Sequence, residues 1–167
     1  MRSLPLGLVV LPLLAVCQTT LAVHFQWAGG RPNLVLVTVL AWNLVSGEAD
    51  GLLWACVGGL ALDGLSGGPM GGNVLALLIL SFITNLISGG LWETHWLFPL
   101  TAVTFGSGIY HMTYLMVLTI SGWSMDWVDA LTTITLPSAL LNLALMIPVY
   151  PAARWLATRI APPRVLP

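Results

Sequence analysis

The chain has 167 residues, of which 57% are hydrophobic and only 7% are charged, and its formal net charge is −1. A soluble domain usually carries about 25% charged residues, so this composition excludes an ordinary water-soluble domain and indicates an integral membrane protein. The near-zero net charge offers no electrostatic basis for binding nucleic acid. No segment is long and polar enough to form a soluble domain, and we predict a single all-α membrane domain over residues 1–167.

Apolar segments alternate with short polar turns along the whole chain, which predicts a bundle of six transmembrane helices. We place these helices at about residues 4–23, 32–46, 51–66, 74–90, 97–120 and 130–150, with a cytoplasmic tail over 151–167. Helices of about 16 residues are about 24 Å long, shorter than a hydrocarbon core of about 30 Å. Short, glycine-interrupted membrane segments often line a cavity instead of spanning cleanly.

The first apolar segment can also be interpreted as a secretory signal peptide, because residues 13–17 loosely resemble a lipoprotein cleavage site. Val16 stands where such a site needs a small residue, and no clean small-x-small site follows. We therefore predict a transmembrane helix here. Cys17 and Cys56 fall in apolar segments without metal-ligating neighbours, which favours small core residues over a disulfide.

The third segment contains a single acid, Asp63. It continues a row of small residues spaced four apart, so these residues share one helix face: Gly51, Ala55, Gly59, Asp63 and Gly67. Small residues let a second helix approach closely in lipid. A charged side chain at mid-membrane costs about 3 kcal/mol or more, so Asp63 needs a partner. It either accepts backbone N–H groups of the glycine-rich loop over 67–71, or it contacts a ligand or partner protein.

Further polar side chains occur inside the later segments, each on the small or polar face of its helix. With Asp63 they form the set Asp63, Asn73, Asn85, His111 and Asn142. They act either as hydrogen bonds between helices, each worth about 0.6 kcal/mol, or as the lining of a pocket that opens outward through the glycine-rich loop.

Motifs for catalysis or cofactor binding are absent from the sequence: it contains no Gly-x-Ser-x-Gly elbow, Walker loop or His-Glu-x-x-His helix. We predict no enzyme, no cofactor and no metal site. Glu93 and His95 are better explained as interfacial residues than as metal ligands, and His111 as a packing histidine than as a proton relay. Tryptophans at predicted helix ends form an aromatic belt: Trp27, Trp92, Trp96, Trp123 and Trp127.

The arginines are distributed unevenly over the predicted turns. Six spans put both termini on one side, together with Arg2, Arg154, Arg159 and Arg164, whereas Arg31 alone falls opposite. The positive-inside rule then places both termini in the cytoplasm. The turns over 46–50 and 91–96 face the cytoplasm as well, and those over 67–73 and 121–129 face outward.

Two motifs lie at a characteristic separation. Arg31-Pro32-Asn33-Leu34 opens the second segment, and Gly-Leu-x-x-Asp63-x-Leu-Ser66-Gly67-x-Pro69-x-Gly71 ends the third. This pattern resembles the rod shape-determining protein MreD family, in which an Arg-Pro-Asp-Leu start is followed by an Asp-x-x-Ser-Gly-x-Pro-x-Gly loop. Asn33 stands where the family usually has Asp. The motifs cover residues 31–73, and the length and six-segment pattern extend the resemblance over most of the chain.

The resemblance implies a non-enzymatic component of the bacterial inner membrane that binds the bitopic protein MreC and helps to organise peptidoglycan synthesis. The implied machinery also contains MreB, RodA and a class B penicillin-binding protein. The family is similar in fold to the substrate-binding subunits of energy-coupling-factor transporters, which supplies an alternative function, a vitamin-like substrate-binding subunit. Our candidates for partner or pocket contacts are Asn33, Asp63, Ser66, Gly67, Pro69, Gly71, Asn73, Asn85, His111 and Asn142.

Overall fold

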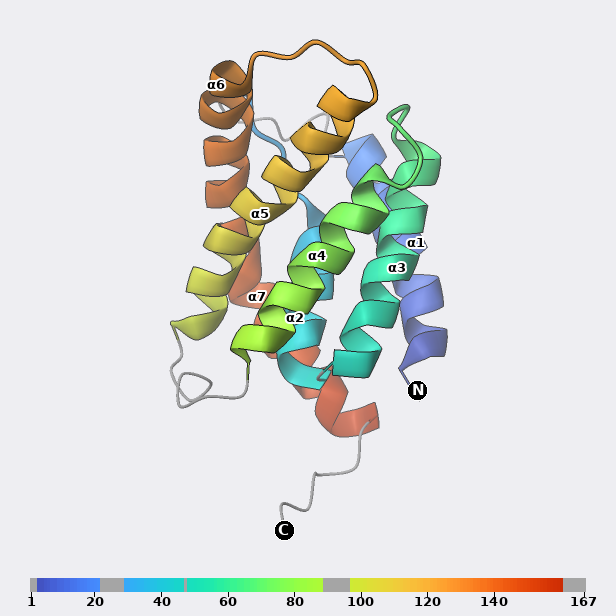
Figure 1. The fold of residues 1–167 in the computed structure, drawn as a ribbon. Helices are drawn as coiled ribbons and strands as arrows, with labels where there is room; N and C mark the ends of the chain where they lie inside the picture. The colour runs from blue at the N-terminus through green and yellow to red at the C-terminus, as the bar shows by residue number, and fades with distance from the viewer. Residues whose placement is uncertain (1–2, 22–28, 47, 89–96, 161–167) are drawn as a thin grey trace.

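The computed structural model describes residues 3–21, 29–46, 48–88 and 97–160, and its regular elements are all helical (Figure 1). The elements in chain order are α1 (Leu4–Leu21), α2 (Leu34–Ser46), α3 (Glu48–Leu65), α4 (Gly72–Ile87), α5 (Phe98–Ile120), α6 (Trp127–Asp129), the π-helical segment η2 (Ala130–Thr135) and α7 (Leu136–Ile160). The last three form one continuous helical run. The predicted all-α class is confirmed for these residues.

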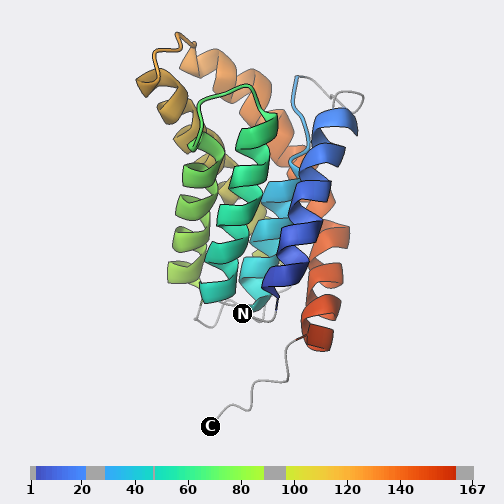
Figure 2. The same ribbon diagram turned by 90° about the vertical axis from the view of Figure 1, so that its right-hand side faces the viewer.

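The helices run up and down in one bundle. The first turn of α1 and the last turn of α7 lie at the same end, which we call the lower end (Figures 1 and 2). The opposite, upper end holds the connection from α3 to α4 over residues 66–71 and the connection from α5 to α6 over 121–126 (Figure 1).

Helix α2 is the central element, and it packs against α1, α3, α4, α5 and α7. Its side chains are buried nearly all round, from Val35 to Asn43. A helix that is apolar all round belongs in an interior. The extended chain before α2 enters the bundle from the upper end (Figure 2), so α2 starts below that end and is short.

The outer surface of the bundle is apolar. Large side chains such as Leu86, Phe105 and Ile147 are mostly exposed on it. Among the described residues, two helical runs are long and apolar enough to cross a membrane, Phe98–Ile120 and Trp127–Ile160. Shorter apolar helices cover Leu4–Thr20, Leu34–Ser46 and Gly72–Ile87. This pattern is consistent with a helical bundle in a bilayer.

Small residues on α3 allow the close helix packing that their spacing predicted. A Cβ added to Gly59 would collide with the backbone of Val74 in α4, and one added to Gly58 would lie 2.8 Å from Val35 Cγ1 in α2. Gly51 similarly faces the Asn43 side chain. Gly67 differs, since it lies beyond the helix and has open space around it.

The start of α3 corrects one prediction. We expected a polar turn over 46–50 and a helix from 51, but α3 begins at Glu48. The Asp50 carboxylate accepts a hydrogen bond from the Ser3 hydroxyl at 2.7 Å. Negative charge in a first helical turn is favourable because it faces the positive end of the helix dipole.

The end of the last helix corrects a second prediction. We expected an interruption at Pro148 and a tail from residue 151, but α7 continues through Pro148 and Pro151 to Ile160. The missing N–H groups of two prolines three residues apart fall close to one helix face. On α7 the small buried Ala153 and Ala157 pack against the core. Residues 151–160 are therefore helical and do not form an irregular tail, whereas 161–167 lie outside the described residues.

The remaining bounds differ from our predictions by a few residues. Helix α2 begins at Leu34 instead of Pro32, α4 spans 72–87 instead of 74–90, and the last helical run begins at Trp127 instead of residue 130. The predicted turn over 91–96, with Glu93, His95 and two tryptophans, lies outside the described residues, as does Trp27.

Candidate functional site

The Asp63 carboxylate sits against the N-terminus of α4. Its Oδ2 accepts the backbone N–H of Gly71 at 2.9 Å and of Val74 at 3.3 Å. Its Oδ1 accepts the backbone N–H and the side-chain amide of Asn73, both at 2.9 Å. Two of these backbone donors, on Asn73 and Val74, belong to the first turn of a helix and have no intrahelical acceptor. Asp63 thus caps α4 from the preceding helix.

The turn from α3 to α4 is shaped for this capping. Gly71 has φ of +90°, a conformation that glycine adopts without the steric cost of a Cβ. It directs its own N–H and those of the following residues back toward α3. The dipole of α4 then favours the negative charge of Asp63. The capping interpretation of Asp63 is thereby confirmed, with its donors at Gly71, Asn73 and Val74 and none at Gly67 or Gly68.

Asn73 links Asp63 to Tyr110 of α5. Its amide also reaches the Ser66 hydroxyl at 3.3 Å, and its Oδ1 accepts a short hydrogen bond from the Tyr110 hydroxyl. The Asn33 side chain lies near the same hydroxyl. Asp63, Asn73, Tyr110 and Asn33 form one buried polar chain across the upper half of the bundle.

Asn33 connects this chain to α7. Its Oδ1 accepts the backbone N–H of Leu36 at 2.9 Å and so caps α2. Its own backbone N–H donates to Asn142 Oδ1 at 2.7 Å, and the Asn142 amide donates to the Ser107 hydroxyl at 3.0 Å. An asparagine is a strong cap, so this position does not need the aspartate that the motif usually has.

The structure brings together most of the predicted candidates, as members of what we call the upper network. These members are Asn33, Asp63, Ser66, Gly71, Asn73 and Asn142. Asn85 is buried lower on α4 and makes no hydrogen bond to the network within the described residues. Pro69 takes part only through its carbonyl, which accepts the Gly72 N–H at 3.2 Å, and Gly67 stands in open space.

Three members of the network were not predicted as site residues: Ser107, Tyr110 and Ser138. Ser138 accepts the backbone N–H of Arg31 at 3.0 Å. One signal could have found two of them, because Ser107, Tyr110 and Tyr114 recur at helical spacing on α5. Ser138 follows Pro137 and shows no comparable pattern.

A cavity of about 600 Å³ adjoins the upper network. Its walls come from the end of α1, the chain before α2, the end of α3, α5 and the run from α6 to α7. Its polar lining includes Gln18, Arg31, Asn33, Ser66, Tyr110, His111, Tyr114, Thr135 and Ser138. Of the five polar residues that we expected to line a pocket, His111 alone lines this cavity, and it does not join the network.

The π-helical segment forms one wall of this cavity through Ala130, Ile134 and Thr135. Pro137, two residues after its end, cannot donate an N–H to the preceding turn, which favours an irregular helix here. The backbone at Gly29 packs tightly against this turn, since an added Cβ would lie 2.7 Å from the Thr133 carbonyl oxygen. Isolated π turns occur frequently at functional sites.

Comparison with known proteins adds one result. A family model described as rod shape-determining protein MreD matches residues 2–160. The chain belongs to the MreD family. No curated protein and no solved structure matches it. Family membership makes this chain a membrane component of the rod-shape system and gives the motif over 31–73 a structural meaning, as the segments that build the upper network.

Proposed function

We propose that this protein is a non-enzymatic component of the bacterial elongation machinery that binds MreC in the inner membrane. Through MreC it would help to organise peptidoglycan synthesis together with RodA, a class B penicillin-binding protein and MreB. The observation that carries the proposal is the family match over 2–160, almost the full described chain.

The upper network supports a structural role over a catalytic one. The Asp63 carboxylate is 7% exposed and accepts four hydrogen bonds from neighbouring N–H groups. A carboxylate used in this way stabilises a helix end and is a poor general base, because its oxygens already have donors. Within the described residues, no group of three or more His, Cys, Asp and Glu could hold a metal ion.

A scaffold of this kind offers its apolar outer face to the single membrane helix of a partner. Association in lipid depends on packing and on small residues, because burying apolar surface gains little there. Gly64 and Gly108 suit such a contact, since a Cβ added to either meets nothing within 4 Å.

The topology in the membrane is part of the proposal. We propose six spans in a single domain, with both termini in the cytoplasm and the upper end facing outward. Cysteine-accessibility labelling of Ala49→Cys and Met125→Cys, in a chain lacking Cys17 and Cys56, tests it. The two positions should react from opposite sides, and reaction from the same side would refute the six-span arrangement.

Purification from native membranes tests the function. We expect a single-span, coiled-coil periplasmic protein to purify with the wild-type chain at constant stoichiometry. A matched preparation of the chain with Gly64→Leu should lose part of that partner while keeping its own thermal stability, if α3 contributes to the contact. Absence of any such protein from the wild-type preparation would contradict the proposal.

A second function deserves a test because of the cavity. A transport subunit needs a preformed pocket with convergent polar groups, and the cavity beside the upper network has both. Such a subunit must also dock an ATPase module. A stoichiometric vitamin bound with nanomolar affinity, together with a copurifying ATPase, would replace the scaffold proposal.

A further inference from the structure

We propose that the last turns of α7 bind the phosphate groups of anionic lipids at the membrane boundary beside the lower end. The surface that does so, which we call the basic face, consists of Arg154, Trp155, Thr158 and Arg159. The proposal goes beyond the scaffold role. It depends neither on the identity of the protein partner nor on which side of the membrane the lower end faces.

The helical run that ends in α7 is longer than a membrane core. Trp127–Ile160 has 34 residues, so its axis is about 51 Å long, whereas a hydrocarbon core is about 30 Å thick. Even a tilt of about 40°, the upper limit for most membrane helices, leaves a span of about 39 Å. The end of α7 lies below the lower ends of α1, α3 and α4 (Figures 1 and 2). The last turns of α7 therefore lie at the level of the lipid head groups.

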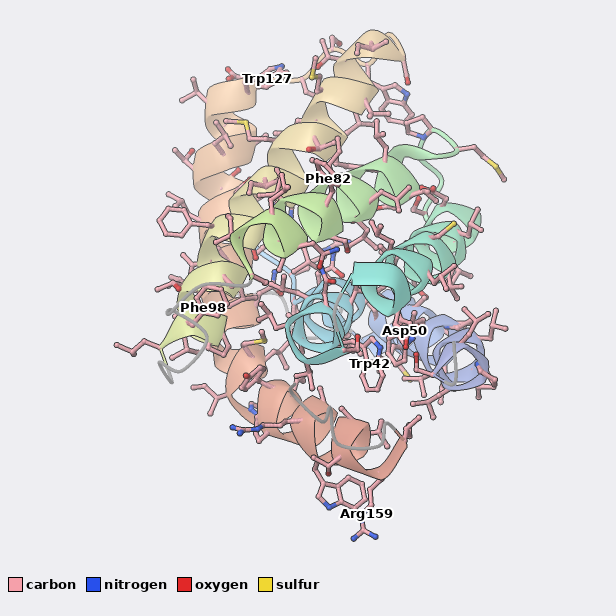
Figure 3. All side chains as sticks on the ribbon, turned by 60° about the horizontal axis from the view of Figure 1, so that its bottom comes forward. Trp42, Asp50, Phe82, Phe98, Trp127 and Arg159 are labelled. Atoms are coloured by element: carbon pink, nitrogen blue, oxygen red, sulfur yellow. The ribbon has the colours of Figure 1, made fainter. Side chains whose placement is uncertain are left out.

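These last turns have two chemically different sides. Ala153 and Ala157 are buried, pack against the hydrophobic core and lie four residues apart on one side of the helix. All four residues of the basic face are exposed. At about 100° per residue they cover an arc of about 140° on the opposite side. Figure 3 shows Arg159 on the side of α7 that points away from the other helices, so the basic face is turned toward the surroundings of the bundle.

The charge of the basic face is positive and uncompensated within the described part of the chain. The sequence contains no acid from residue 130 to 160, and neither Arg154 nor Arg159 makes an ion pair with a described residue. The guanidinium group of Arg159 lies over the Trp155 ring, with Cζ 5.3 Å from the ring centroid. A ring contact leaves the charge of the guanidinium group in place. Its planar N–H donors match the geometry of phosphate oxygens.

The ring of Trp155 favours a lipid over an acidic protein segment as the ligand. This side chain is 60% exposed, although it is the largest apolar group of the last turns. Tryptophan is enriched at the boundary between hydrocarbon and head groups, and arginine there lays its apolar stem along hydrocarbon with its charge among the phosphates. An aromatic ring with a guanidinium group over it matches the two layers of a lipid at this boundary.

Lipid binding to the purified full-length chain tests the proposal, measured by native mass spectrometry in a neutral detergent. Phosphatidylglycerol is titrated in parallel with phosphatidylcholine, which has a phosphate group but no net charge. We expect phosphatidylglycerol to bind at least about tenfold more tightly, a difference of about 1.4 kcal/mol. Equal binding of the two lipids would overturn the proposal.

Glutamine variants locate the binding. Arg159→Gln should weaken phosphatidylglycerol binding about fivefold, and Arg154→Gln combined with Arg159→Gln at least about tenfold. Arg31→Gln is the matched control, because it removes the same charge at the opposite end of the bundle, and it should bind as the wild type does. Circular dichroism checks that every variant is folded. Equal losses in Arg31→Gln and Arg159→Gln would show an effect of net charge alone and contradict the proposal.

A lysine variant separates lipid binding from structural support. Arg154→Lys combined with Arg159→Lys keeps both charges at the surface and should retain most of the phosphatidylglycerol binding. A loss as large as that of the double glutamine variant would refute a charge-based lipid surface.

Purification from native membranes separates a lipid from a protein ligand. The double glutamine variant should lose bound anionic lipid and keep the proteins that purify with the wild type. Unchanged lipid binding together with loss of a copurifying protein would assign the basic face to an acidic protein segment and overturn the lipid proposal.

Discussion

The two ends of the bundle are built by opposite means. At the upper end, polar side chains from α3, α4, α5, α7 and the chain before α2 satisfy one another and border a cavity. At the lower end, Trp42 and Trp54 stack with ring centroids 4.4 Å apart and an interplanar angle of 9°. The Trp54 ring also packs against Gly7, where an added Cβ would lie only 2.9 Å from it.

At the lower end the aromatic side chains pack closely, whereas several buried polar atoms lack a hydrogen-bond partner among the described residues. The Nε1 atoms of both tryptophans and the Asn43 Oδ1 are buried without a partner among the described residues. Among the described residues, the polar contacts at this end include the hydrogen bond from Ser3 to Asp50 and the one from the Asn43 amide to the Ser81 carbonyl at 3.0 Å. Figure 3, in which the lower end is turned forward, labels Trp42 and Asp50 at this end. We infer from this contrast that the closely packed lower end contributes most of the stability of the fold. The upper end, with its cavity, is then the end that is able to accept a ligand or partner.

The largest expected effect is at the lower end. Trp54→Ala removes a fully buried ring and leaves a void between α1, α2 and α3, which should lower the free energy of unfolding by about 3–5 kcal/mol. Unfolding by sodium dodecyl sulfate in mixed micelles measures this. Trp54→Phe is the control, because it keeps an aromatic ring and removes an N–H without a partner, and it should cost about 1 kcal/mol or less. Similar losses in both variants would mean that the Trp54 N–H matters more than its packing.

The second effect is at the upper end. Asp63→Ala leaves four donors without their acceptor, and we expect a loss of about 3 kcal/mol, on the basis of about 1–3 kcal/mol per unsatisfied buried group and partial access of water. Asp63→Asn should cost less, but it is not neutral: an amide has one acceptor oxygen, and its NH2 group faces two donors. The same unfolding assay compares them. If Asp63→Ala is as stable as the wild type, the cap on α4 is dispensable. The hydrogen bonds of the upper end would then contribute less to stability than their number implies.

A smaller effect tests the link between α4 and α5. Tyr110→Phe removes the hydroxyl that donates to Asn73 and should cost about 1 kcal/mol, the usual net value of one hydrogen bond. Tyr114→Phe is a matched control, since its hydroxyl has no hydrogen-bond partner among the described residues. Thermal unfolding in detergent, monitored by circular dichroism, measures the difference in stability between the two variants. If the two variants are equally stable, the network contributes little to stability.

The last effect, of about the same size, concerns the turn before α4. Gly71→Ala should cost about 1 kcal/mol, because alanine at φ of +90° is strained even though nothing crowds its Cβ. Gly67→Ala, which has the same open surroundings without a positive φ, should be neutral. A thermal shift of Gly71→Ala no larger than that of Gly67→Ala would indicate that the turn relaxes at no cost.

Much of the upper end could be predicted from the sequence. An acid inside an apolar segment, followed by a glycine-rich loop, left two alternatives for Asp63, a cap on the loop or a contact with a ligand or partner, and the structure shows Asp63 capping the start of α4. Asn73 and Asn142 stood out because amides are rare in apolar helices and need partners, whereas Asn33 stood out through the motif over 31–34. Asn85 stood out for the same reason as Asn73, yet it lies outside the network, because the twelve residues that separate it from Asn73 on α4 span about 18 Å along the helix axis.

The sequence by itself determined the membrane class, the helical segments and the family, since composition, hydropathy and the motif over 31–73 are local properties of the chain. It did not determine the Trp42–Trp54 stack, the cavity or the partners of Asn33, which join residues as much as 109 positions apart. It also misplaced the end of the last helix, where Pro148 and Pro151 argued locally for an interruption. Only the tertiary structure decided these features, because packing of Ala153 and Ala157 against the core outweighs a few missing backbone hydrogen bonds.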